Sequence, residues 1–157
     1  MIALLLLFAA GTRPGVPPAT TPKLKAMTAC LAVTRADVEM ALGRRVGKAQ
    51  EELRATESTC DYASAHGQVT VTLQRLQAEP DLPAEMAAMQ REIADSSVRP
   101  GPALGTGAFF LDIAGAGTQL HVMRGREYLL VSVLGFGEGA AVSAAAEQMA
   151  RAALGRM

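Results

Sequence analysis

The chain has 157 residues, of which 50% are hydrophobic and 19% are charged, and this composition suffices for one domain with a single hydrophobic core. The 15 basic residues balance the 15 acidic residues, so no net positive field attracts a phosphate backbone. Aromatic residues make up only 4% and Trp is absent, which leaves no stacking platform for bases, and we predict no nucleic-acid binding.

An uncharged apolar run occupies residues 2–10 (IALLLLFAA) and has the length of the hydrophobic region of a secretory signal peptide. It is shorter than the roughly 20 residues that cross a bilayer, and a Pro- and Thr-rich stretch over 12–21 follows it. We therefore predict a signal peptide and linker over 1–29 and a single domain over 30–157. This domain is expected to be exported to the periplasm or the cell surface, with no transmembrane helix in the mature chain.

The chain contains two cysteines, Cys30 and Cys60. In an oxidising compartment the two thiols pair, and closing a loop of about 30 residues removes unfolded-state entropy worth roughly 3.5 kcal/mol in the chain-entropy model. The Cys-x-x-Cys spacing of redox-active pairs is absent, so we predict a structural disulfide. A lipid anchor at Cys30 is disfavoured, because Lys23 and Lys25 interrupt the apolar segment that should precede a lipidated cysteine.

The first predicted element of the domain is a helix over 35–42. Thr34 and Asp37 form a loose capping box at its start, and Gly43 is placed to end it in a left-handed conformation. Two strands joined by a turn follow, over 59–64 and 68–76. Apolar and polar residues alternate in the second strand, which predicts one buried and one solvated face.

A second helix is predicted after Pro80, with Pro83 in its first turn, where the missing N–H has no partner to lose. Its apolar residues fall on one stripe at helical spacing: Leu82, Met86, Met89 and Ile93. The segment over 96–107 is rich in Gly and Pro and is expected to break the regular structure.

Three strands are predicted next as an antiparallel meander, over about 108–113, 118–123 and 127–134. The last is apolar on both faces, which is typical of a central strand covered on each side. A helix over about 139–154 completes the order helix, strand, strand, helix, strand, strand, strand, helix. This order predicts an α+β fold with a mostly antiparallel sheet of about five strands and helices packed on it.

Short motifs along the chain resemble those of a known group. Cys30-Leu31 leads into a Thr-capped helix that ends in Leu42-Gly43, and residues 58–62 (STCDY) open a strand. These features resemble small envelope lipoproteins of unknown function of the actinobacterial type. Residues 105–110 (GTGAFF), 120–125 (LHVMRG) and 129–133 (LLVSV), followed by an Ala-rich helix, are similar to the extracellular sensor domains of mycobacterial serine/threonine kinases. The resemblance covers 30–154 and implies a ligand- or partner-binding envelope domain, with no catalytic residues.

No pattern of residues predicts catalysis. The chain lacks a Gly-x-Ser-x-Gly elbow, and its cysteines are expected to be oxidised. His66 and His121 have no Cys, His or Asp cluster at ligand spacing, so we predict no metal site. In the glycine-rich connection over 135–139, Glu138 would repel a phosphate, and no cofactor is predicted. A hydrolase or a metal-binding protein is therefore disfavoured.

Two functional hypotheses remain. The preferred one is a non-enzymatic envelope domain that binds another protein or a surface component. Arg124 and Arg126 are candidate contacts with such a partner. The alternative interpretation is that both are charged turn residues that interact only with solvent. The second is a carrier or sensor of a small apolar ligand held between the sheet and the helices. The residues expected to line such a pocket are Met86, Phe109, Leu130 and Met149.

Overall fold

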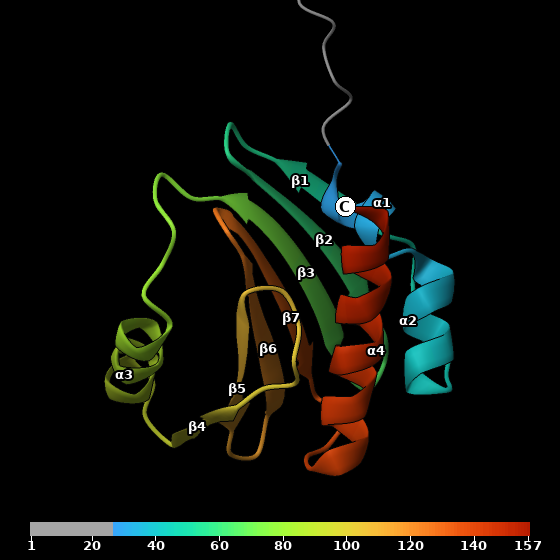
Figure 1. The fold of residues 1–157 in the computed structure, drawn as a ribbon. Helices are drawn as coiled ribbons and strands as arrows, with labels where there is room; N and C mark the ends of the chain where they lie inside the picture. The colour runs from blue at the N-terminus through green and yellow to red at the C-terminus, as the bar shows by residue number, and fades with distance from the viewer. Residues whose placement is uncertain (1–26) are drawn as a thin grey trace, which may run out of the picture.

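A computed structural model describes residues 27–157 of the chain. The predicted signal peptide, and the predicted linker up to residue 26, lie outside the described residues. Residues 27–157 form a seven-stranded antiparallel sheet with four helices (Figure 1). No helix in this range is long and apolar enough to cross a membrane.

The helices are α1 (Ala29–Ala32), α2 (Arg35–Leu42), α3 (Leu82–Glu92) and α4 (Ala140–Arg156). The strands are β1 (Gln50–Leu53), β2 (Glu57–Ala63), β3 (Gln68–Arg75), β4 (Ser96–Pro100), β5 (Gly107–Ile113), β6 (Gly117–Arg124) and β7 (Glu127–Leu134). Their order in the sheet is β1-β2-β3-β7-β6-β5-β4, and every neighbouring pair is antiparallel. The predicted α+β class is confirmed.

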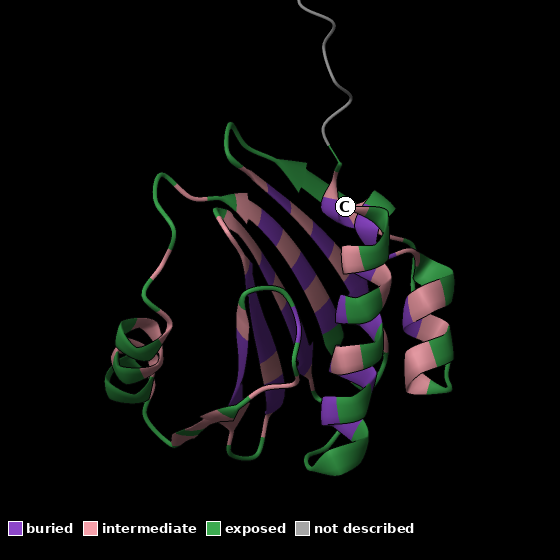
Figure 2. Cartoon of the chain, in the orientation of Figure 1, coloured by how far each residue is buried: buried purple, intermediate pink, exposed green. Residues whose placement is uncertain are grey.

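The hydrophobic core lies between one face of the sheet and α1, α2 and α4, whereas α3 lies against the other face (Figure 1). One cross-strand row shows how the core is built, because register aligns five buried residues on this face: Cys60, Val71, Val131, Leu120 and Phe110. The buried stripe of α4 meets this row with small alanines and with Met149 (Figure 2). Since alanine side chains are short, α4 packs close to the strands.

In the spatial order of the sheet, β7 is the fourth of the seven strands and lies between β3 and β6. Its central place agrees with the prediction from its apolar sequence. The antiparallel meander of β5, β6 and β7 is also found, and β3 shows the predicted alternation, with Val69, Val71 and Leu73 buried. These matches follow from period-two burial, which a local sequence window can reveal.

The predicted count of about five strands is wrong, because β1 and β4 form the two edges of the sheet. All four residues of β1 are exposed, so its sequence (QEEL) has no buried face to produce an alternating pattern. The segment expected to break the structure contains β4 (SSVRP). Pro100 is tolerated in β4 because one side of an edge strand has no neighbouring strand. A residue whose N–H would point to that side can lack the N–H without losing a hydrogen bond of the sheet. The predicted element order also missed α1.

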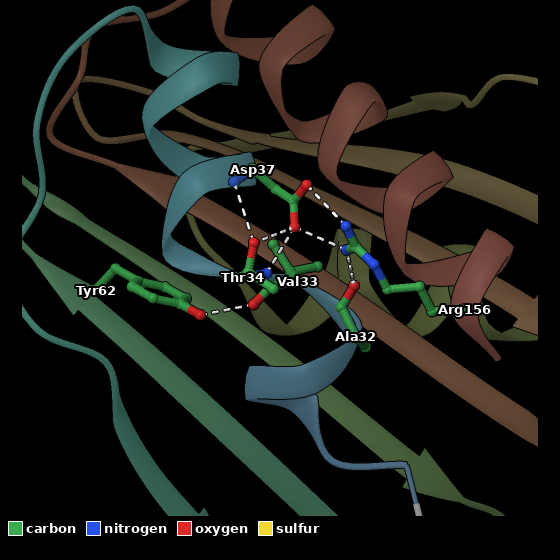
Figure 3. A network of polar contacts seen from close by, with 6 residues as sticks. All are labelled: Ala32, Val33, Thr34, Asp37, Tyr62 and Arg156. Atoms are coloured by element: carbon green, nitrogen blue, oxygen red, sulfur yellow. Dashed lines mark hydrogen bonds and ion pairs between the residues drawn. The ribbon is translucent and has the colours of Figure 1, made fainter.

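Polar contacts join the start of the domain to its end (Figure 3). The capping box of α2 is present as predicted: Asp37 N–H donates to the Thr34 hydroxyl, and the Asp37 carboxylate accepts from Thr34 N–H. Arg156 of α4 donates to the same carboxylate and to Ala32 C=O, while Tyr62 O–H donates to Val33 C=O at 2.6 Å. Gly43 ends α2 in the left-handed region with φ 64°.

A disulfide joins Cys30 in α1 to Cys60 in β2, with the two Cα atoms 5.1 Å apart. It fastens α1 to strand β2 of the sheet. The predicted disulfide between the two cysteines is therefore confirmed, and neither cysteine is free.

Candidate functional site: a polar cleft beside strand β4

A cleft of about 830 Å³ opens between the first turns of α4 and the β4–β5 edge of the sheet. Strand β4 lines one wall with Ser96, Ser97 and Arg99, and α4 lines the other with Ser143, Ala144 and Glu147. The cleft lies on the same face of the sheet as the core, beyond the part that α4 covers fully. Sheet topology thus builds the cleft, since β4 and α4 are far apart in the sequence.

The guanidinium of Arg99 is held from three directions. Nε donates to Asp112 Oδ2 at 2.5 Å and Nη2 donates to Ser143 Oγ at 2.5 Å, while the Phe110 ring centre lies 4.0 Å from Cζ. The Arg99 side chain is still 41% exposed. A cation fixed in this way is oriented before any ligand arrives, so binding to it costs little conformational entropy.

Asp112 is the counter-ion of Arg99. Its carboxylate also accepts from the Thr118 hydroxyl at 2.6 Å. Burial by itself raises the pKa of Asp112, but hydrogen bonds from Arg99 and Thr118 and the positive charge of Arg99 outweigh burial and leave the pKa below its usual value. The carboxylate therefore stays ionised at neutral pH and keeps Arg99 in place.

The cleft carries an excess of negative charge. Its lining includes four carboxylates, on Asp95, Asp112, Glu138 and Glu147, against the single guanidinium of Arg99. Glu138 accepts a hydrogen bond from Gly115 N–H, and Glu147 pairs with Arg151 at 2.5 Å. Within residues 27–157 no group of three or more Cys, His, Asp or Glu is placed to hold a metal ion.

A second cluster lies on the α3 face of the sheet. The His121 ring is only 2% exposed and stacks on Phe109, with ring centres 4.4 Å apart. Nδ1 of His121 and the Tyr128 hydroxyl are 2.5 Å apart, whereas Nε2 is buried without a hydrogen-bond partner in the described structure. Burial lowers the pKa of His121 to about 4, and burial together with the negative charge of Glu85 on α3 raises that of Tyr128.

The structure separates the four residues of the predicted ligand pocket. Phe109 and Leu130 align with His121 across the strands and face α3, on which Met86 is half-buried. Met149 of α4 packs in the core on the opposite face. A single pocket lined by all four is therefore wrong, because the sheet itself stands between them. None of the four lines the cleft beside β4.

The arginines predicted to contact a partner bind their own chain. Arg124 pairs with Glu127 at 2.7 Å and donates to Leu154 C=O, and Arg126 donates to Leu76 C=O. They hold the β6–β7 turn against its neighbours. The other histidine, His66, is exposed in the β2–β3 turn.

A smaller groove of about 500 Å³ lies near the β1–β2 turn. Apolar side chains from different parts of the chain meet there, among them Leu53, Leu73 and Met157, with Tyr128 also in its wall.

Sequence reasoning missed Arg99 and Ser143. Arg99 stood in a segment expected to be irregular, and a serine in an Ala-rich helix carries no signal of its own. No protein-family model, curated protein or solved structure matches this chain.

Proposed function

We propose that this chain is an exported, non-enzymatic binding domain that holds another protein of the cell envelope in the cleft beside β4. The observation that carries the proposal is the fixed but accessible guanidinium of Arg99. Its Nε and Nη2 are used by Asp112 and Ser143, while the two N–H groups of Nη1 have no partner within residues 27–157. They are available to the carbonyl oxygens of a bound polypeptide.

The chemistry of the cleft supports binding over catalysis. Within residues 27–157, the one hydroxyl bonded to Arg99 is that of Ser143, which accepts a hydrogen bond from the guanidinium, and no histidine lines the cleft to act as a base for it. His66 and His121 lie in the β2–β3 turn and on the α3 face. The cleft therefore offers oriented donors and carboxylates, which suit recognition of a polar surface.

Export is supported by the Cys30–Cys60 disulfide, because such bonds persist in oxidising compartments and are rare in the cytosol. The apolar run over 2–10 has the length of a signal peptide core and supports the same compartment.

The binding site is tested by photo-crosslinking in the cells of origin. A photoreactive amino acid at Ala144, which is exposed in the cleft, is expected to give a discrete adduct with one envelope protein. The matched control is Ala65, exposed in the β2–β3 turn, where no such adduct forms. Equal adducts at both positions, or none at Ala144, contradict the proposal.

The adduct partner is then purified and its affinity measured. Arg99→Ala is expected to weaken binding by roughly tenfold or more, since a charge-assisted hydrogen bond is lost. Arg54→Ala is the control, because Arg54 is likewise paired with carboxylates but lies in the β1–β2 turn. An unchanged affinity in Arg99→Ala contradicts a role for the cleft.

The groove near Leu53 favours a second candidate function, the carriage of a small apolar ligand. Leu53 is 62% exposed and contributes apolar surface to the groove, so Leu53→Glu should not disturb the core. If the groove binds such ligands, an apolar fluorescent probe such as N-phenyl-1-naphthylamine binds the wild type and not Leu53→Glu. Equal binding to both excludes the groove.

A further inference from the structure

The outer edge of β4 carries backbone groups that a further strand would use. Gly101 N–H donates to Ala108 C=O of β5, so alternate residues before it, Arg99 and Ser97, also direct their backbone groups toward β5. The N–H and C=O groups of Ser96 and Val98 therefore point away from the sheet. An open edge of this kind is a template for pairing with another chain.

The side chain of Gln90 on α3 occupies this edge. Its Oε1 accepts from Val98 N–H at 2.9 Å, and its Nε2 donates to Ser96 C=O at 2.9 Å. These two backbone groups flank Ser97. A residue opposite Ser97 in a parallel neighbouring strand would bond to the same two groups through its own N–H and C=O. The Gln90 amide therefore stands in for one peptide unit of an added strand.

Helix α3 is held in place weakly. None of its residues is buried, and its apolar side chains Leu82, Met86 and Met89 are only half-buried. Within residues 27–157, the hydrogen bonds that α3 side chains make to the sheet are the two from Gln90. Displacing Gln90 from β4 thus breaks two neutral hydrogen bonds and no ion pair.

The cleft adjoins the same edge, and its charge determines which side chains an added strand can place there. Ser97 and Arg99 direct their side chains into the cleft, so every second side chain of a strand added to β4 would face it. Four carboxylates against one guanidinium favour positive side chains at those positions. The same excess of negative charge disfavours a second copy of this chain at the edge.

We infer that the partner docks as an extended segment that adds to β4 in parallel orientation, with Lys or Arg at alternate positions facing the cleft, and displaces the Gln90 amide. The inference rests on the proposed function and names its partner class. Main-chain hydrogen bonds supply affinity and the alternating side chains supply specificity, as in other cases of strand addition. Pro100 limits the ladder at its end, since it has no N–H to offer.

The probe is a capped synthetic peptide of alternating Lys and Thr with a nitroxide label at its N-terminus, titrated into the full domain and followed by amide NMR. We expect shifts at Ser96, Ser97 and Val98, and broadening by the label near Asp95 rather than near Gly101, as a parallel strand requires. Gln90→Ala is expected to bind roughly tenfold more tightly, because two competing hydrogen bonds are gone. Arg91→Ala, an exposed neighbour on α3, should bind as the wild type does.

Two control peptides separate strand pairing from charge attraction. A peptide of alternating N-methyl-Lys and Thr keeps the charge but lacks the N–H groups that would donate to β4, and a Glu–Thr peptide reverses the charge; neither should bind. Equal binding of the N-methyl-Lys peptide, an unchanged or weaker affinity in Gln90→Ala, or no binding of the Lys–Thr peptide overturns the inference. So does dimerisation of Gln90→Ala through β4 without peptide binding.

The purified crosslinked partner distinguishes this inference from the proposed function. If Arg99→Ala weakens its binding while Gln90→Ala leaves it unchanged, the cleft binds the partner but strand addition is wrong. If Arg99→Ala has no effect, the proposed function itself fails.

Discussion

Arg156, in the last turn of the C-terminal helix, donates to both carboxylate oxygens of Asp37, in the first turn of α2, at 2.7 and 3.0 Å (Figure 3). The two residues are 119 positions apart, and the Asp37 side chain is only 13% exposed. One carboxylate thus serves as the cap of α2 and as the anchor of α4. Because its contacts join two helices and the carboxylate is largely buried, it should matter more to stability than a surface ion pair does.

Asp37→Ala removes the capping box and the ion pair together. We expect it to lower the free energy of unfolding at pH 7 by about 2 kcal/mol, as measured by urea denaturation. Glu147→Ala, which removes an exposed pair with Arg151, should cost less than about 0.5 kcal/mol. Equal losses in the two variants would show that the Asp37 contacts add nothing beyond surface pairing.

The effect of Asp37 depends on pH. The hydrogen bond from Arg156 and those from Thr34 outweigh burial and lower the pKa of Asp37 from 3.8 to about 2 in the folded chain. The unfolded state therefore takes up a proton first as the pH falls. The stability difference between wild type and Asp37→Ala should be complete above about pH 4 and shrink as the pH falls toward 2. A difference that is constant from pH 7 to 2 contradicts the assignment.

His121 should make the domain sensitive to mild acid. Burial lowers its pKa from 6.5 to about 4 in the folded state, so between these values the unfolded state binds the additional proton. Its contribution to stability is complete above about pH 6.5 and is lost as the pH falls toward 4. From pH 7 to 5 this amounts to about 2 kcal/mol.

His121→Phe keeps an aromatic ring against Phe109 and removes the titration. Denaturation at pH 7 and at pH 5 should give a smaller loss of stability in this variant than in the wild type. An equal loss would place the proton uptake elsewhere.

The disulfide is expected to contribute about 3.5 kcal/mol to stability in the chain-entropy model. The double variant with Cys30→Ser and Cys60→Ser should unfold at correspondingly lower urea, and each single variant should match the double one. Thiol labelling of the protein taken from its cells tests the compartment at the same time. Two reactive thiols in the native molecule would contradict both the bond and the export that it supports.

Gly67 lies where two chain segments touch. A Cβ atom at this position would be 2.0 Å from the backbone oxygen of Leu134 at the end of β7. Gly67→Ala should therefore cost about 3 kcal/mol or more, because backbone must move. Gly43→Ala meets no atom within 4 Å and suffers only from φ +64°, so it should cost about 1 kcal/mol. The opposite ranking in thermal denaturation would contradict the packing described for the β2–β3 turn.

Local patterns in the sequence determined the elements with a buried face. Three features could be predicted because each depends only on residues close together in the sequence. They are the capping box at Thr34, the alternation in β3 and the apolar sequence of β7. The placement of His121 on the face opposite Leu120 follows from the same period. The two cysteines could be paired because no third thiol competes.

Tertiary structure alone decided the candidate site. Arg99 and Ser143 are 44 positions apart, and only the placement of β4 next to β5 and of α4 across the sheet brings them together. The edge strands β1 and β4 lack the buried alternation that marks a strand in sequence. Met149 and Phe109 were predicted to share a pocket because both are hydrophobic. Hydrophobicity does not indicate which face of the sheet a helix such as α4 will cover, so it could not show that the two residues lie on opposite faces. Long-range strand and helix placement, not local preference, sets these relationships.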